Sequence, residues 1–151
     1  MTTALLDVNV LLALGDQDHV QHALVTKWFV ENADQGWATC PVTENGFVRI
    51  ISQPGYANHT TTVDALERLA SAVGDPAHEF WPCDLSLTAA DQVERSRLLG
   101  PSQVTDAYLL ALAVSRGGRF VTLDQRVDWC VALAARPESL LVLASLETDQ
   151  D

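Results

Sequence analysis

Short apolar runs alternate with longer amphipathic stretches along most of the chain. The apolar runs predict strands at residues 3–6, 37–40, 79–83, 120–123 and 140–143. Apolar residues at helical spacing predict helices at residues 8–14, 20–32, 44–51, 61–73, 88–99, 106–116 and 126–134. This alternation is typical of an α/β protein whose mostly parallel sheet is covered on both faces by helices. Because proline cannot donate a hydrogen bond to a neighbouring strand, Pro82 places the third strand at a sheet edge or marks its end.

Two acidic residues near the end of the chain can be placed relative to each other from the dimensions of helices and strands. A helix over residues 106–116 rises by about 16 Å. It stops at Gly117-Gly118, where glycine can adopt the positive φ of a helix end. The run over residues 119–124 then returns at about 3.3 Å per residue, which covers about the same distance. We therefore expect Asp124 to lie level with Asp106.

Two more acids follow predicted strands, Asp7 after the first and Glu44 after the second. In parallel sheets ligands bind beyond the carboxyl ends of the strands. Each acid has an ordinary structural explanation, as a helix cap or as part of a first helical turn. Four carboxylates at one edge would nevertheless repel one another, and a divalent cation would offset that repulsion. Mg²⁺ and Mn²⁺ prefer such oxygen ligands, so the acids predict a metal site formed by Asp7, Glu44, Asp106 and Asp124.

Three polar residues lie close to these acids in the sequence. Asn9 can hold an acid or a metal-associated water with its amide, or it can bond to nearby backbone. Thr105 and Thr122 flank the acids and can support them through hydrogen bonds, or they can serve as an ordinary cap and strand residue. We treat Asn9, Thr105 and Thr122 as candidate supporting residues of the metal site.

Composition limits how the chain can meet a nucleic acid. The 151 residues predict one domain over residues 1–151, with a net charge of -11 and Lys27 as the single lysine. This charge argues against a protein that holds nucleic acid by a basic surface alone. Metal ions, a few arginines or a basic partner must then compensate locally. The candidate arginines, each of which can also be an ordinary solvated charge, are Arg49, Arg95, Arg97, Arg119 and Arg126.

The cysteines indicate a reducing compartment. Cys40, Cys83 and Cys130 are odd in number and widely spaced, which supports neither a disulfide framework nor a zinc site. The sequence has no basic segment before an apolar run at its start, and no apolar stretch approaches about 18 residues. We therefore expect a cytoplasmic protein with no signal peptide and no membrane contact.

Two other classes of function fit an acidic pocket at a sheet edge. The first is a phosphoryl-transfer domain, such as a receiver or an aspartyl phosphatase. Such phosphatases use a second aspartate two residues after the nucleophile, where this chain has Asn9, and both classes place a lysine near the phosphate, whereas Lys27 falls within a predicted helix. The second is a non-enzymatic module whose vestigial pocket binds a basic partner.

Four blocks of the sequence closely resemble the PIN-domain family, and in particular the VapC toxins of bacterial toxin–antitoxin pairs. The blocks are LLDVNVLLA at residues 5–13, TE at 43–44, VTDAYL at 104–109 and VTLD at 121–124, and together they span most of the chain in order and spacing. The resemblance implies a metal-dependent endoribonuclease with a three-layer α/β/α fold, which hydrolyses RNA phosphodiester bonds.

The resemblance also implies roles for individual residues and for partners. By it, Asp7, Glu44, Asp106 and Asp124 bind Mg²⁺ or Mn²⁺ directly or through water, with support from Asn9 and Thr122. Proteins of this kind usually form homodimers. A VapB antitoxin holds them inactive and often inserts a basic residue into the acidic pocket, which would suit the acidic character of this chain.

Overall fold

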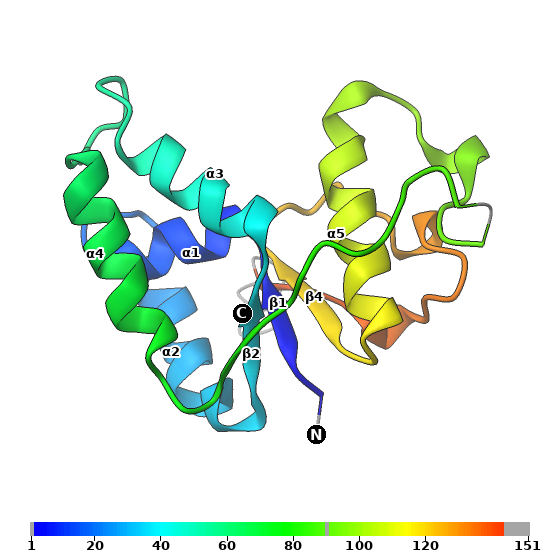
Figure 1. Ribbon diagram of the computed structural model, residues 1–151, viewed down its shortest axis with the longest axis horizontal. Helices are drawn as coiled ribbons and strands as arrows, with labels where there is room; N and C mark the ends of the chain where they lie inside the picture. The colour runs from blue at the N-terminus through cyan, green and yellow to red at the C-terminus, as the bar shows by residue number, and fades with distance from the viewer. Residues whose placement is uncertain (1, 90, 144–151) are drawn as a thin grey trace, which may run out of the picture.

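The sheet of this computed structural model, which describes residues 2–89 and 91–143, is parallel throughout. Its strands are β1 (Ala4–Leu6), β2 (Trp37–Thr39), β3 (His78–Phe80), β4 (Arg119–Thr122) and β5 (Leu140–Val142). They lie in the order β3-β2-β1-β4-β5 (Figure 1). β1 is central and pairs with both β2 and β4, where Leu5 lies opposite Ala38 and Phe120. This arrangement brings the carboxyl ends of β1 and β4 side by side.

The helices and the side chains of the strands form a three-layer α/β/α fold. The α-helices are α1 (Val8–Gly15), α2 (His22–Asn32), α3 (Pro41–Ile51), α4 (Thr62–Val73) and α5 (Val104–Ser115). Successive side chains of a strand point to opposite faces. Accordingly Leu6 packs with residues of α1–α4, whereas Leu5 packs with α5. Figure 1 shows α1–α4 together on one side of the sheet and α5 on the other.

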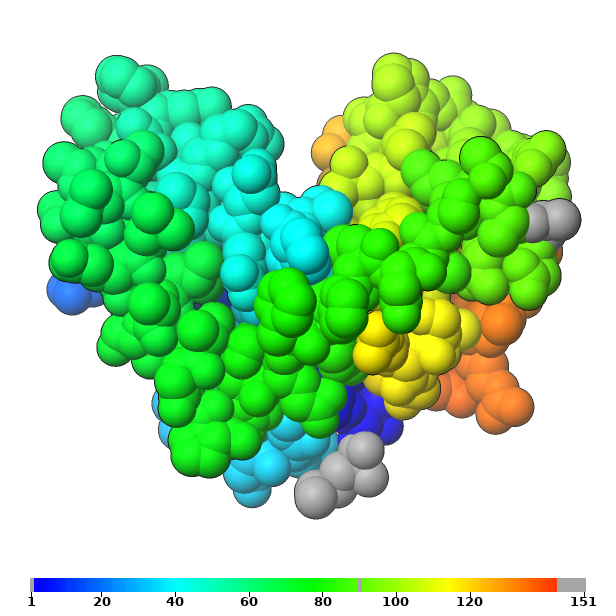
Figure 2. Space-filling model, viewed as in Figure 1, coloured from blue at the N-terminus to red at the C-terminus, as the bar shows by residue number. Residues whose placement is uncertain are grey.

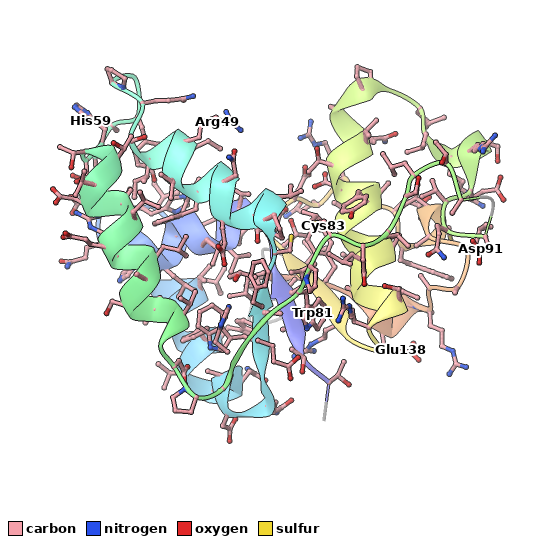
Figure 3. All side chains as sticks on the ribbon, viewed as in Figure 1. Arg49, His59, Trp81, Cys83, Asp91 and Glu138 are labelled. Atoms are coloured by element: carbon pink, nitrogen blue, oxygen red, sulfur yellow. The ribbon has the colours of Figure 1, made fainter. Side chains whose placement is uncertain are left out.

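The central strands are buried on both faces, which explains their continuous apolar sequences. All residues of β1 and β2 are buried, while β3, at the edge of the sheet, is half-buried to exposed. β3 ends at Phe80, two residues before Pro82, so the prediction of an edge strand is confirmed. The chain then crosses to the α5 face, with Trp81 and Cys83 along the crossing segment (Figure 3).

The predicted stop after α5 is also confirmed. Gly117 has a φ of 69°, in the left-handed region that favours glycine. The next residue, Gly118, donates its backbone N–H to the Ala113 carbonyl and closes the helix end. Within the described residues, no helix is both long and apolar enough to cross a membrane.

The helices predicted at residues 88–99 and 126–134 are wrong. Apart from single 3₁₀ turns at Arg95–Arg97 and Trp129–Val131, the described residues of these segments form turns, an isolated bridge and irregular backbone. The two segments pair with each other instead: Val93 forms an antiparallel bridge with Ala132, and the Glu94 N–H donates to the Val131 carbonyl. Tertiary pairing therefore satisfies the backbone groups that a local helix would have used.

The other 3₁₀ turns connect the main elements. They are Ala33–Gln35 after α2, Pro101–Gln103 before α5 and Pro137–Ser139 before β5. The turn at Pro101–Gln103 leads directly into α5, so it helps to fix the start of this helix, and Asp106 lies in its first turn.

Candidate active site

The site lies at the point where the strand order changes direction. The chain passes from β1 to β2 on one side, and β4 returns to the other side of β1 before β5 continues outward. Such a switch point opens a crevice beyond the carboxyl ends of the strands. Asp7 follows β1 directly, Asp124 follows β4, and Asp106 lies in the first turn of α5. In the space-filling view the molecule is hollowed at this edge, between the part that carries α3 and the part that carries α5 (Figure 2).

Asp7 is the most deeply buried of the predicted site acids, with 7% of its surface exposed. Its Oδ1 accepts a hydrogen bond of 2.7 Å from the Val8 N–H, which caps α1, and its Oδ2 accepts one of 2.7 Å from the Thr122 hydroxyl. Burial raises the pKa of Asp7, these two hydrogen bonds oppose the rise, and the charge of Asp124 adds to it. Asp7 is therefore a carboxylate held in one orientation.

The Thr122 hydroxyl connects the ends of β1 and β4. It accepts hydrogen bonds from the Asn9 amide nitrogen (3.2 Å) and from the Asp124 N–H (3.1 Å), so its own hydrogen is directed to Asp7. Asn9 also accepts from the Leu123 N–H at 3.1 Å. Because a backbone N–H can only donate, the amide oxygen of Asn9 must face it. Asn9 thus bonds both to the backbone and to the threonine that holds Asp7.

Asp106 faces the same crevice from α5. Burial and then the charges of Asp7 and Asp124 raise its pKa, Arg126 partly offsets them, and the net pKa is about 6. The three aspartates therefore lie near enough to repel one another. Thr105, also predicted as a supporting residue, is exposed, and its side chain makes no hydrogen bond to another described residue.

Asp124 differs from the other two aspartates because it has a cation beside it. Arg126 donates to it twice, from Nε to Oδ1 (3.0 Å) and from Nη2 to Oδ2 (3.0 Å). The backbone N–H of Arg126 also bonds to Oδ1. These contacts hold the pKa of Asp124 below its usual value, with the Arg126 side chain as the main cause.

The structure places Glu44 in the first turn of α3 and directs it toward β2 and β3. Its Oε2 accepts a hydrogen bond of 2.6 Å from the Thr39 hydroxyl, which lies 2.8 Å from Nε2 of His78. Since Thr39 donates to Glu44, its oxygen accepts from His78 Nε2–H. Glu44 is not among the charges that shift the pKa of Asp7 or of Asp106. It therefore stands apart from the three aspartates in this structure.

Sequence reasoning missed both Thr39 and His78. Thr39 ends β2 and His78 begins β3, and their approach follows from the pairing of Trp37 with His78 and of Thr39 with Phe80. Burial lowers the pKa of His78, against the opposing charges of Glu44, Asp75 and Glu79. Neither residue belongs to a motif, so only the register of the two strands identifies this contact.

The donor set fits a hard divalent cation in its chemistry. Asp7 and Asp106 are carboxylates whose pKa values are raised in part by neighbouring negative charge, which a cation would offset. Among residues 2–89 and 91–143, no three Asp, Glu, His or Cys side chains converge closely enough to form a complete metal site. In this structure Asp124 is bonded to Arg126 and Glu44 to Thr39.

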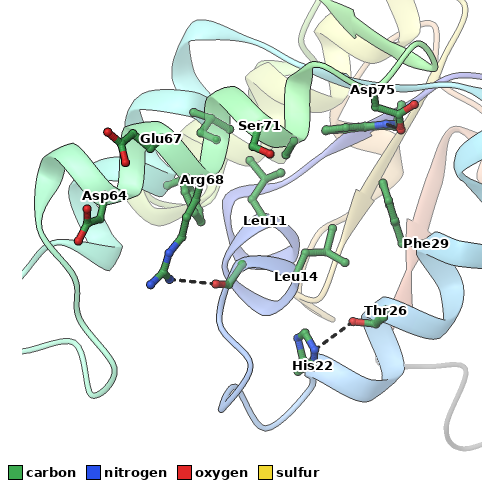
Figure 4. A pocket seen from close by; sticks show the side chains of 15 residues that line it. Leu11, Leu14, His22, Thr26, Phe29, Asp64, Glu67, Arg68, Ser71 and Asp75 are labelled. Atoms are coloured by element: carbon green, nitrogen blue, oxygen red, sulfur yellow. Dashed lines mark hydrogen bonds between the residues drawn. The ribbon is translucent and has the colours of Figure 1, made fainter.

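A cavity of about 800 Å³ lies away from this site, between α1, α2 and α4 (Figure 4). Leu11, Leu14 and Phe29 line it, and Arg68 donates to the Gly15 carbonyl at its side (3.2 Å). None of the predicted site residues contributes to its lining. The polar chemistry of the sheet edge is therefore separate from this apolar cavity.

Comparison with known proteins agrees with this geometry. The family model of the PIN domain matches residues 4–129. Ribonuclease VapC44 of Mycobacterium tuberculosis is 49% identical over 140 residues, which cover 93% of this chain and 99% of the relative. The chain belongs to the VapC-type PIN-domain family. Ribonuclease VapC39 of the same organism is 45% identical to this PIN domain over 123 residues, or 81% of the chain and 88% of the relative.

Solved structures show that the fold of this PIN domain is shared at low sequence identity. VapC20 of M. tuberculosis, a toxin that cleaves the sarcin-ricin loop, aligns with a TM-score of 0.59 at 12% identity, covering 89% of this chain and 99% of the other. VapBC2 from Rickettsia felis, bound to a DNA fragment from their promoter, gives a TM-score of 0.56 at 11% identity, covering 82% and 89%. These similarities confirm the predicted three-layer fold.

The role of Thr122 in this PIN domain can be tested by replacing it with valine, which has a similar shape but no hydroxyl. Thr122→Val leaves Asp7 without its donor and the Asp124 N–H without its acceptor, so the free energy of unfolding should fall by about 1–3 kcal/mol. Urea denaturation measures this change. Thr105→Val, at an exposed position, is the matched control and should change stability by less than about 0.5 kcal/mol. Equal stability of the two variants would contradict the role given to Thr122.

The raised pKa of Asp106 predicts a pH-dependent stability in the metal-free PIN domain. Because the folded-state pKa of about 6 exceeds the ordinary value of 3.8, ionised Asp106 destabilises the fold at neutral pH. This destabilisation is complete above a pH of about 6 and disappears as the pH falls toward about 4. In the presence of a chelator, Asp106→Asn should therefore melt at a higher temperature than the wild type at neutral pH, and the difference should shrink on acidification.

Thermal melts of both proteins across this pH range measure the effect. Asp91→Asn, at an exposed turn, is the control for the charge change itself. A melting difference between Asp106→Asn and wild type that does not vary with pH would show that ionisation of Asp106 does not destabilise the fold.

Proposed function

We propose that this PIN domain, over residues 1–151, is a metal-dependent endoribonuclease that hydrolyses RNA phosphodiester bonds as the toxin of a toxin–antitoxin pair. The observation that carries the proposal is the position of Asp7, Asp106 and Asp124 at the crevice beyond β1 and β4, where burial and the charges of these residues raise the pKa values of Asp7 and Asp106. The names of the relatives, ribonucleases VapC44 and VapC39, support the activity.

The proposed cofactor is Mg²⁺ or Mn²⁺. Asp7, Asp106 and Asp124 would hold it directly or through water, and Glu44 would take part through Oε1, the oxygen that Thr39 leaves free. A divalent cation at this place would supply positive charge that activates a water molecule and stabilises the phosphodiester oxygens.

The chain itself orients the Asp7 carboxylate through a network of hydrogen bonds. The Val8 N–H donates to one oxygen of Asp7 and Thr122 donates to the other, so each oxygen keeps a lone pair that could bind a cation. Asn9 keeps Thr122 in its orientation by donating to it, and it is itself fixed by the Leu123 N–H. This network holds Asp7 in place before any ligand arrives, which favours catalysis because little reorganisation is then needed.

The proposed partners follow from charge and from the family. With a net charge of -11, the chain has few cations of its own to offer to RNA or to balance its acids. A VapB-like antitoxin with a basic residue would complement the acidic crevice, and the VapBC2 structure of R. felis supports a partner of this kind. We also propose a homodimer, and a cytoplasmic location in keeping with the free Cys40, Cys83 and Cys130.

Replacement of Asp7 by asparagine tests the proposed function. Asparagine keeps the shape of the side chain but removes its charge, so the fold should be retained. Loss of a residue that merely supports a metal ligand typically costs about 10–100-fold in activity, so loss of Asp7 should reduce RNA cleavage by at least about 100-fold. The assay follows cleavage of labelled RNA by the purified protein with Mn²⁺ and with a chelator.

Asp18→Asn, at an exposed position, is the matched control and should cleave like the wild type. Full cleavage by Asp7→Asn, or wild-type cleavage that is equal with Mn²⁺ and with chelator, would overturn the proposal.

A further inference from the structure

Arg126 is an exposed cation at the mouth of the acidic crevice. Its side chain is 83% exposed, whereas that of its partner Asp124 is 21% exposed. Its guanidinium also acts on Asp106, since it lowers the pKa that the other two aspartates raise. Arg126 therefore faces two of the three acids while most of its surface remains in solvent.

Asp124 does not depend on the Arg126 side chain for its position. The backbone N–H of Arg126 donates to Oδ1 of Asp124 at 2.9 Å, and the Asp124 N–H donates to Thr122 at 3.1 Å. If the guanidinium left, these backbone contacts would still fix the residue. Oδ2, whose hydrogen bond comes from Arg126 Nη2, would then become free to accept another ligand.

The exchange of such a partner costs little. Because the Arg126 side chain is 83% exposed, water already solvates much of its charge and screens its ion pair with Asp124. An arginine that is mostly in solvent can therefore trade one anionic partner for another of similar strength. The planar guanidinium fork matches a phosphate as well as it matches a carboxylate.

A small cavity lies beside this ion pair. It has a volume of about 60 Å³, and its lining includes Asp106, Asp124 and Arg126 together with Arg97 and Ser102. That volume holds only a few water molecules, so it can receive one group of a nucleic acid strand but not an extended segment. On the same rim Arg97 pairs with Asp128 at 3.3 Å, with both side chains about half exposed. Two arginines therefore border a recess that also contains two of the site acids.

We propose that Arg126 exchanges Asp124 for a phosphate of the bound RNA strand, so that the Arg126–Asp124 ion pair is the resting state of a substrate-binding residue. This inference rests on the proposed function. The exchange meets two needs at once: it gives an RNA phosphate a cation in a chain of net charge -11, and it frees Oδ2 of Asp124 when the substrate arrives. Substrate and metal ion would then favour each other's binding, because each removes an obstacle to the other.

The first experiment measures steady-state cleavage of a labelled, mixed-sequence single-stranded RNA in the presence of Mn²⁺. In Arg126→Ala the KM should rise about tenfold or more, since a charge-assisted hydrogen bond to the substrate is lost. The slope of log(kcat/KM) against log salt should become shallower by about 0.7, the value for one phosphate contact on a single strand. Arg126→Lys should retain most of the salt slope and have an intermediate KM.

The matched control is Arg136→Ala, which removes the same charge from an exposed residue. Arg136 precedes β5, so it lies toward the amino end of that strand, whereas the site lies beyond the carboxyl ends. Its KM and salt slope should equal those of the wild type. If Arg126→Ala matches Arg136→Ala in both quantities, Arg126 does not bind the substrate and the inference fails. Absence of cleavage by the wild type would instead be a failure of the proposed function.

The second experiment needs no RNA. Mn²⁺ alone should raise the melting temperature of Arg126→Ala by more than that of Arg136→Ala, because the guanidinium no longer competes for Asp124. Equal Mn²⁺-induced shifts in the two variants would overturn the exchange, since Arg126 would then have no effect on the availability of Asp124.

Discussion

Repulsion among three aspartates at one edge of the sheet is the constraint on which the site depends. Asp7, Asp106 and Asp124 meet there because β1 and β4 end side by side and α5 begins at the same level. Asp124 is balanced by Arg126, but Asp7 and Asp106 form no ion pair within the described residues. The fold thus holds mutually repelling negative charges at a fixed place, and relief of this repulsion would strengthen the binding of a cation there.

The site is rigid on one side and adjustable on the other. Asp7 is buried and held by Thr122 and by the first turn of α1, so its carboxylate is already oriented. Asp124 is paired with Arg126, whose side chain is mostly in solvent, and Glu44 is bonded to the Thr39 hydroxyl through Oε2 only. In the proposed site, Asp124 would become available when Arg126 leaves it, and Glu44 would take part through its other oxygen.

Sequence could predict the fixed side better than the adjustable side. β1 and β4 are short, buried and apolar, and an acid follows each of them, so the positions of Asp7 and Asp124 follow from local pattern. The direction of Glu44 does not, because Thr39 and His78 meet only through the register of β2 and β3. The helices expected at residues 88–99 and 126–134 failed for a similar reason, since these distant segments bond to each other. In each case the deciding contact is made by a residue far away in the sequence, and the local pattern does not identify that residue.

Anomalous X-ray diffraction from crystals of the protein grown with Mn²⁺ tests the central claim most directly. We expect an anomalous peak within bonding distance of the Asp7 and Asp106 carboxylates, at the crevice beyond β1 and β4. A protein that cleaves RNA but shows no manganese at this place, with Asp7 and Asp106 unchanged, would contradict it.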